Sequence, residues 1–196
     1  IGTLFSLVYL WYARLAGMQG AAAIAVVGIG NRLESITYLT GDGFGMATAT
    51  FVGQNLGAGD KARATRGAWH AVRIMTIVGL GVSAAMLAFP RELLSLLTQD
   101  PEAIALGVPY LRVLALCQVG TALEGPIGAA FAGAGDTVPP MVIHVGFALL
   151  RFPLASWGAV ALGSGLMGVA WTMTATCLVR AGVLTAWFLR GRWKPT

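Results

Sequence analysis

The sequence has few charged residues, and this shortage excludes an ordinary water-soluble domain. Only 11% of its 196 residues are charged, whereas 57% are hydrophobic, and soluble domains carry roughly 25% charged residues. Histidine and cysteine are also scarce, with two of each, and no CxxC or HExxH spacing points to a metal site. Cys117 and Cys177 lie inside hydrophobic stretches, so we expect small buried thiols rather than a disulfide.

Basic residues outnumber acidic ones and give a net charge of +5. In a soluble protein this would suggest nucleic-acid binding, but here the basic residues stand mostly at the ends of hydrophobic stretches, where they set the orientation of membrane helices. The loop after residue 57 and the C-terminal tail share this basic character: Lys61, Arg63, Arg66, Arg190, Arg192 and Lys194. We therefore expect both to face the cytoplasm, and we expect no nucleic-acid partner.

Hydrophobic stretches long enough to cross about 30 Å of hydrocarbon recur along the whole chain. They predict an all-α bundle of six transmembrane helices, in one unit, over about residues 1–16, 21–57, 67–89, 106–133, 141–163 and 166–189. The second stretch would be roughly 55 Å long as one helix, so it must tilt, bend near Gly41, Gly43 and Gly45, or project from the membrane. The first stretch is short and already begins at Ile1, so we expect a longer polypeptide that continues before it.

Glycines mark turns and close helix contacts. The string Gly-Ala-Gly-Asp occurs at residues 57–60 and again at residues 133–136. A glycine-rich turn before a helix can bind phosphate, but no strand precedes either copy and neither fits GxxxxGK[ST], so we expect a helix cap and a tight turn. Small residues at intervals of four also predict close approach of helices: Gly41, Gly45 and Ala49, and Gly125, Ala129 and Gly133.

Ionisable side chains inside the hydrophobic stretches are candidates for function, because a charge in the bilayer core is costly. The second stretch carries a polar stripe at spacings of three and four, formed by Asn31, Glu34, Tyr38 and Asp42. These spacings place the four residues on one helical face. That face must meet protein or water.

The fourth stretch carries a second polar stripe, formed by Gln118, Thr121 and Glu124 at intervals of three. Two carboxylates, Glu34 and Glu124, then face the interior of the bundle from two helices near mid-depth. A carboxylic acid at that depth can take up a proton at one membrane face and release it at the other. Ion coupling is therefore the predicted role of these acids, with Asp42 as a third candidate.

The arginines have simpler interpretations. Five of them lie within reach of the end of a stretch or can extend to the membrane surface, and we assign most of these to anchoring the helices: Arg14, Arg73, Arg151, Arg180 and Arg190. Arg32 or Arg112 offers an alternative to ion coupling, because either can form a structural ion pair with a buried acid. In the sixth stretch, Thr172, Thr176 and Arg180 recur at intervals of four and can hydrogen-bond to a neighbouring helix.

Several stretches resemble the multidrug and toxic compound extrusion (MATE) family. The strongest match begins with RLES at residues 32–35, continues through the glycines of residues 41–45 and ends with FVGQNLGAG at residues 51–59. A second match is ALE at residues 122–124, followed by FAGAGDT at residues 131–137 and by Pro139. The similarity covers nearly the whole chain in order.

The resemblance implies one of the two six-helix lobes of such a transporter, the second, with the first lobe of the same polypeptide as its partner. It implies export of small organic, often cationic compounds across the cell membrane, coupled to inward proton or sodium flow and without a cofactor. Family members carry coupling acids on helices that correspond to the second and fourth stretches, which implies this role for Glu34 and Glu124. Some members place the latter acid about one turn earlier, at Thr121. The residues expected to line or support the substrate path are Asn31, Arg32, Tyr38, Gln118 and Thr121.

Three other functions stay open. A flippase for lipid-linked precursors, from the same superfamily, would favour a larger and more cationic cavity. An intramembrane serine protease would need a nucleophile and a base, and Ser83 and His144 are the nominees, although their apparent depths differ. The chain can also be a lobe that does not transport by itself. We expect a transporter rather than an enzyme.

Overall fold

A computed structural model of the chain describes residues 2–161 and 163–191. Within them the chain is helical and has no strand, which confirms the predicted all-α membrane fold. The elements are α1 (Gly2–Gly17), α2 (Ala21–Gly57), α3 (Lys61–Ala88), α4 (Pro90–Ser95), α5 (Pro101–Ala115), α6 (Gln118–Gly133), α7 (Val138–Ser156), the π-helical η1 (Trp157–Ala161) and α8 (Gly165–Leu189). The basic tail residues Arg192 and Lys194 lie outside the described residues.

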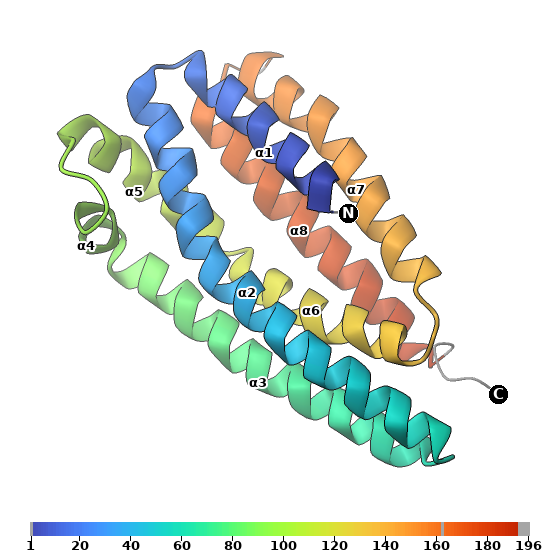
Figure 1. Cartoon of the computed structure of the whole chain (residues 1–196). Coiled ribbons are helices and arrows are strands. Elements are labelled where there is room, and N and C mark those ends of the chain that lie inside the picture. The colour runs from blue at the N-terminus through green and yellow to red at the C-terminus, as the bar shows by residue number, and fades with distance from the viewer. Residues whose placement is uncertain (1, 162, 192–196) are drawn as a thin grey trace.

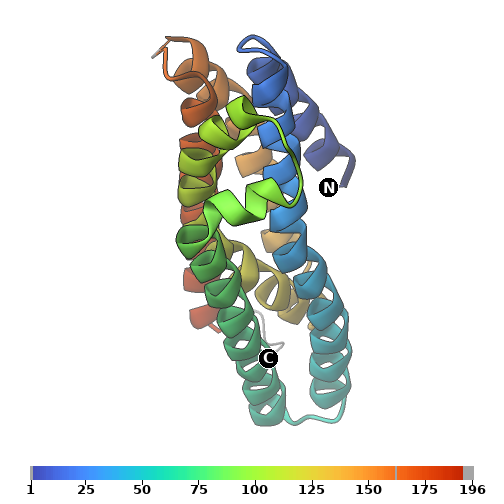
Figure 2. The same cartoon turned by 90° about the vertical axis from the view of Figure 1, so that its left-hand side faces the viewer.

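The helices pack around α6. This helix lies in the middle of the bundle against α2, α3 and α8, and α1, α7 and α8 lie together on one side (Figure 1). The long helix α2 is uninterrupted over 37 residues. Where α2 meets α3, the two helices project beyond α6 and α8 (Figure 2). This projection accounts for the extra length of the second predicted stretch.

Three helices of the described chain are long and apolar enough to cross a membrane. They are α3, the stretch of α7 and η1 from Val138 to Val160, and α8. The pair α5 and α6, bent by 45°, makes a fourth crossing if the pair is one span. The stretch predicted over residues 106–133 is therefore two helices, and it begins earlier, at Pro101. Since α1 has only 16 residues and α2 carries polar groups, crossings by these two helices stay a prediction.

The repeated Gly-Ala-Gly-Asp string makes the same turn twice. Gly59 and Gly135 both have a φ of +80°, a left-handed conformation that glycine adopts without strain. In each copy the backbone N–H of the Asp donates to a carbonyl in the last turn of the preceding helix, at 2.8 and 3.0 Å. The Asp60 carboxylate then accepts from the N–H of Arg63 at 2.8 Å and caps α3. The predicted tight turn is confirmed in both copies, whereas the Asp cap of the next helix is confirmed only at Asp60, since Thr137 stands at the N-cap of α7 without a side-chain cap bond.

Helices α2 and α6 run parallel and touch backbone to backbone. A Cβ added at Gly125 would lie 2.9 Å from the carbonyl oxygen of Gly41. One added at Gly45 would lie 3.4 Å from the Cβ of Ala129, and one added at Gly133 would collide with the α2 backbone. The predicted close approach of helices at these small residues is confirmed, and the structure pairs the two runs with each other one to one.

This contact predicts that Gly125→Ala destabilises the protein while Gly128→Ala does not. The added methyl at position 125 would push against the Gly41 carbonyl, and such overpacking typically costs about 1–3 kcal/mol. No atom lies within 4 Å of a Cβ at Gly128, where alanine favours the helix by up to about 1 kcal/mol. Thermal unfolding of both variants of the full-length protein in detergent checks this, and equal midpoints would contradict the close contact.

Candidate functional site

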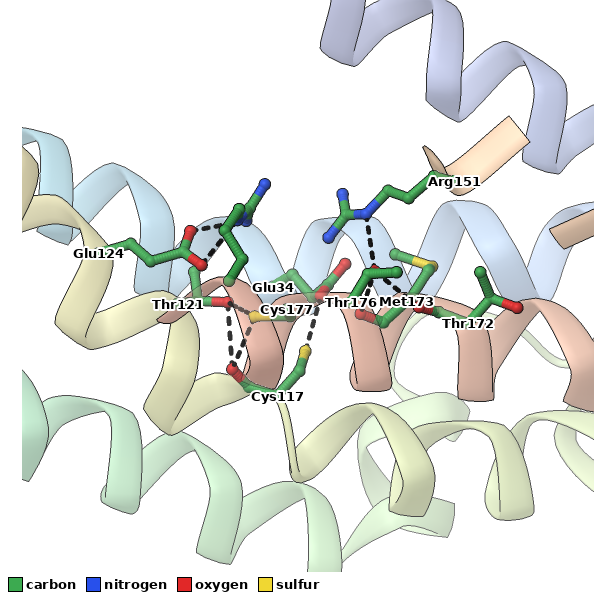
Figure 3. A network of polar contacts seen from close by, with 10 residues as sticks. Glu34, Cys117, Thr121, Glu124, Arg151, Thr172, Met173, Thr176 and Cys177 are labelled. Carbon is green, nitrogen blue, oxygen red and sulfur yellow. Dashed lines mark hydrogen bonds and ion pairs between the residues drawn. The ribbon is translucent and has the colours of Figure 1, made fainter. Parts of the chain in front are cut away.

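Glu34 lies within α2 with its carboxylate inside the protein, and its side chain is only 6% exposed. The hydroxyl of Tyr9, on α1, donates a hydrogen bond of 3.1 Å to Oε2. The thiol of Cys117 donates to Oε1 at 3.3 Å, as Figure 3 shows. Both donors are uncharged, and no ion pair within the described part of the chain involves Glu34. Neutral hydrogen bonds therefore hold this carboxylate.

A turn at Leu116 and Cys117 separates α5 from α6. Their backbone N–H groups bond to carbonyls three residues back, at 3.2 and 3.1 Å, whereas a continuous α-helix bonds four residues back. The turn therefore leaves the carbonyl of Val113 without its usual helical donor. This carbonyl accepts from the N–H of Leu116 and also from the hydroxyl of Thr174, on α8, at 3.0 Å. A side chain from a neighbouring helix thus helps to satisfy the backbone at a depth where water is scarce.

The same break directs two polar side chains at α2. The Cys117 thiol reaches Glu34. Gln118 is fully buried, and its amide oxygen accepts a hydrogen bond of 2.7 Å from the hydroxyl of Thr37, which follows Glu34 on α2. Tyr9, Glu34, Thr37, Cys117 and Gln118 form one buried group, which we call the Glu34 cluster.

Glu124 of α6 forms an ion pair with Arg180 of α8. The guanidinium donates from Nε to Oε1 at 2.8 Å and from Nη2 to Oε2 at 2.6 Å. Only 8% of the Glu124 side chain and 4% of the Arg180 side chain are exposed. A bidentate pair of this kind engages both carboxylate oxygens in a fixed geometry. Glu124 is therefore already neutralised by a cation that belongs to the protein.

A second buried arginine, Arg151 of α7, also contacts α8. Its Nε donates to the hydroxyl oxygen of Thr176 at 2.9 Å (Figure 3). Among the residues that the structure describes, the buried charged side chains are two carboxylates and two guanidinium groups. Their formal charges cancel, which limits the cost of placing four ionisable groups inside a membrane bundle.

The predicted stripe over Gln118, Thr121 and Glu124 lies inside the bundle. Gln118 and Glu124 are buried, and Thr121 is half-buried. The Thr121 hydroxyl donates to the carbonyl of Cys117 at 3.2 Å and lies 3.4 Å from the sulfur of Cys177 (Figure 3). Both cysteines are buried and free, as predicted. Helix α6 thus joins the Glu34 cluster at its start to the ion pair further along.

The structure splits the stripe that was predicted on α2. Glu34 faces the break between α5 and α6, together with Thr37. Tyr38 and Asp42 are exposed, and Asn31 is half-buried. Residues four apart drift by about 40° per step around a helix, so the later members of the stripe turn away from the buried face.

Two assignments made from the sequence are wrong. Arg151 and Arg180 do not anchor the helices at the membrane surface, since each side chain is only 4% exposed. The partner of Glu124 is Arg180, whereas Arg32 and Arg112, the predicted alternatives, are both exposed. The sequence did contain a signal for Arg180, because the spacing of four from Thr172 and Thr176 predicted contacts with neighbouring helices.

Tyr9 and Thr37 were missed by the sequence analysis, and Cys117 was predicted only as a packing residue. Thr37 follows Glu34 by three residues, so helical spacing alone would place it on the same face. Tyr9 carries no such signal. Its role depends on α1 lying beside α2, and only the fold shows this.

The candidate nucleophile and base of a serine protease, Ser83 and His144, do not form a catalytic pair. Ser83 lies on α3 and His144 on α7, and the described hydrogen bonds include none between them. The Nδ1 of His144 is buried without a hydrogen-bond partner. A serine nucleophile needs its base within hydrogen-bonding reach, so the described geometry gives this alternative no support.

The fold and the site define a class of protein. A helical bundle with membrane-length apolar helices, buried charged groups and a broken helix beside them is typical of integral membrane proteins that move solutes or ions. The MatE family model matches residues 2–157. The chain therefore belongs to the MATE family of multidrug transporters, as the resemblance in the sequence predicted.

Curated relatives match along nearly the whole chain. The probable multidrug resistance protein NorM of Thermotoga maritima is 27% identical over 191 residues, which cover 97% of this chain and 41% of NorM. The protein of the same name from Caulobacter vibrioides is 31% identical over 183 residues, which cover 92% of this chain and 38% of that protein. The chain thus spans about 40% of the length of these relatives.

A solved structure shares the fold. A MOP superfamily transporter from Pyrococcus furiosus matches with a TM-score of 0.85 at 23% identity, over 97% of this chain and 42% of its own. The chain is accordingly a multi-pass membrane protein with the helix arrangement of this family.

The buried ion pair predicts a strong coupling between Glu124 and Arg180. Arg180→Gln alone leaves the carboxylate charged and buried, and breaking a buried pair in this way typically costs about 3–5 kcal/mol. The double variant Glu124→Gln/Arg180→Gln removes both charges and should recover most of the loss. Unfolding midpoints of the three full-length variants, including Glu124→Gln, measure the coupling. Additive losses would show that the ion pair contributes nothing.

Proposed function

We propose that the chain is one six-helix lobe of a secondary transporter, which exports small organic and often cationic compounds against an inward flow of protons or sodium ions. Family membership supports this, and so do the relatives called multidrug resistance proteins. Their greater length supports a second six-helix lobe in the same polypeptide as the partner. The proposal places the protein in the cell membrane with its C-terminus in the cytoplasm, without enzymatic activity and without a cofactor.

The coupling assignment rests on the difference between the two buried carboxylates. Both oxygens of Glu124 are held by the Arg180 guanidinium, whereas the donors to Glu34 among the described residues are a phenol and a thiol. A coupling cation must neutralise a carboxylate that nothing else neutralises. We therefore assign cation coupling to Glu34 and a structural role to Glu124. Asp42, exposed on α2, stays a predicted coupling residue outside this cluster.

The surroundings of Glu34 favour a proton over a sodium ion. Hard cations are bound by several oxygen ligands, and thiols suit softer metals. One carboxylate oxygen of Glu34 faces the sulfur of Cys117, 3.3 Å away, so that side of the carboxylate offers no oxygen ligand. A proton needs only the carboxylate itself.

The charge of the interior supports drug export over lipid-precursor flipping. A flippase would favour a more cationic cavity, but the two buried arginines of the described chain are matched by two buried glutamates. The exposed residues Arg32, Tyr38 and Asp42 on α2 are then available to line a substrate path between this lobe and its partner.

The coupling role predicts that Glu34→Gln in the full-length protein lowers efflux of fluorescent organic cations at least tenfold. The amide is nearly the same size as the carboxylate and keeps a hydrogen-bond acceptor, but it cannot bind and release a proton. Efflux from cells and uptake into proteoliposomes under an imposed pH or sodium gradient measure the effect. Glu92→Gln, which changes an exposed acid of α4, is the matched control and should transport normally.

Amounts of folded protein, compared by size-exclusion chromatography, separate coupling from folding. Normal efflux by folded Glu34→Gln would contradict the coupling role. Loss of folded protein would instead assign Glu34 a structural role. Efflux driven by the sodium gradient alone would contradict proton coupling.

A further inference from the structure

The first turns of α3 carry a basic groove. It has a volume of about 530 Å³ and is lined chiefly by Lys61, Thr65, Arg66, Trp69, His70 and Arg73. Lys61, Thr65, Trp69 and Arg73 recur at intervals of four, and Arg66 and His70 each follow one residue later, which places all six on one side of the helix. From this groove we infer that the protein binds the phosphate headgroup of an anionic phospholipid at the start of α3.

No ion pair among the described residues neutralises this positive charge. Lys61, Arg66 and Arg73 bring three permanent cations to the groove, and no carboxylate lines it. The one ion pair within the described residues lies elsewhere, between α6 and α8. Asp60, the acid next to the groove in sequence, accepts from the backbone N–H of Arg63 as the helix cap. An external anion is therefore the complement that the groove lacks.

The groove lies at the level of the membrane surface. The Trp69 ring packs against Phe188, at the end of α8, with ring centroids 5.3 Å apart. Gly67 contacts Phe51, close to where α6 ends beside α2. Trp69 thus marks the level at which the neighbouring helices end, as interfacial tryptophans typically do. Lys61, eight residues earlier, reaches about 12 Å further out, across the layer that lipid headgroups occupy.

The same face of α3 continues into an apolar stripe. One turn after Arg73 comes Ile77, which is 70% exposed, and then Leu80, which is 53% exposed. A phospholipid fits both parts, because its phosphate meets the cations while an acyl chain lies along the apolar residues. A free phosphate ion would leave the apolar stripe unused. The end of α3 that carries the groove is the one predicted to be cytoplasmic, where anionic lipids gather.

The experiment measures lipid binding and does not depend on transport activity. The full-length protein in phosphatidylcholine nanodiscs is titrated with phosphatidylglycerol, and bound phosphatidylglycerol is counted by native mass spectrometry. Each basic residue near an anionic membrane surface contributes about a factor of five to binding, so Arg66→Gln/Arg73→Gln should weaken retention about 25-fold. Arg63→Gln is the matched control, because Arg63 is exposed on the same turns but does not line the groove.

A charge-preserving variant distinguishes the loss of positive charge from misfolding. Arg66→Lys/Arg73→Lys should keep most of the binding, and its failure in a folded protein would contradict a role for charge. An equal loss in Arg63→Gln would show that only general surface charge matters and would overturn the site. Displacement of phosphatidylglycerol by an equal concentration of inorganic phosphate would show a site for free anions and would overturn the lipid assignment.

Discussion

The hydrocarbon core of a membrane contains almost no water, so a charge placed there must be satisfied by the protein itself. The bundle meets this constraint with internal partners. Arg180 neutralises Glu124 and ties α8 to α6, and Arg151 ties α7 to α8 through Thr176. The constraint also distinguishes Glu34, whose partners are neutral groups from α1 and from the break before α6. Within the part of the chain that the structure describes, Glu34 is therefore the buried acid without an ion pair.

The small residues between α2 and α6 explain why that acid meets the break. Gly41 lies against Gly125, and the same offset continues to Ala49 and Gly133, where α6 ends. Because the helices run parallel, this register pairs Glu34 with Gln118, the first residue of α6. Side chains larger than those present along this contact would separate the two backbones. The polar cluster therefore depends on glycines that carry no polar group themselves.

Much of the fold follows from local sequence. Hydrophobic length predicted the helices, and the repeated Gly-Ala-Gly-Asp string predicted two turns that share a φ of +80° at glycine. The burial of Glu34, Gln118 and Glu124 also followed from helical spacing. The break at Leu116 and Cys117 did not, because no proline or glycine stands there. The break is instead accompanied by a contact between distant parts of the chain, in which the Thr174 hydroxyl of α8 donates to the carbonyl of Val113.

The sequence could not predict which side chains on different helices contact each other. The match of Arg180 with Glu124 depends on α6 and α8 being neighbours, and spacing along one helix says nothing about this. The split of the α2 stripe has a different cause. A stripe at spacings of four drifts by about 40° around the helix at each step. Tyr38 and Asp42 are therefore exposed, while Glu34 stays inside.

The proposed proton on Glu34 has a structural consequence that follows from hydrogen-bond chemistry. An ionised carboxylate only accepts, and here it accepts from Tyr9 and from Cys117. A protonated acid gains a donor at one oxygen and loses its negative charge, so the hydrogen bonds that it accepts from Tyr9 and Cys117 become weaker. The two donors belong to α1 and to the turn between α5 and α6, which α2 connects through Glu34. Neither of these two donors belongs to the ion pair between Glu124 and Arg180. Proton binding would therefore act on the contacts of α1 and of the break, while α6 and α8 stay joined.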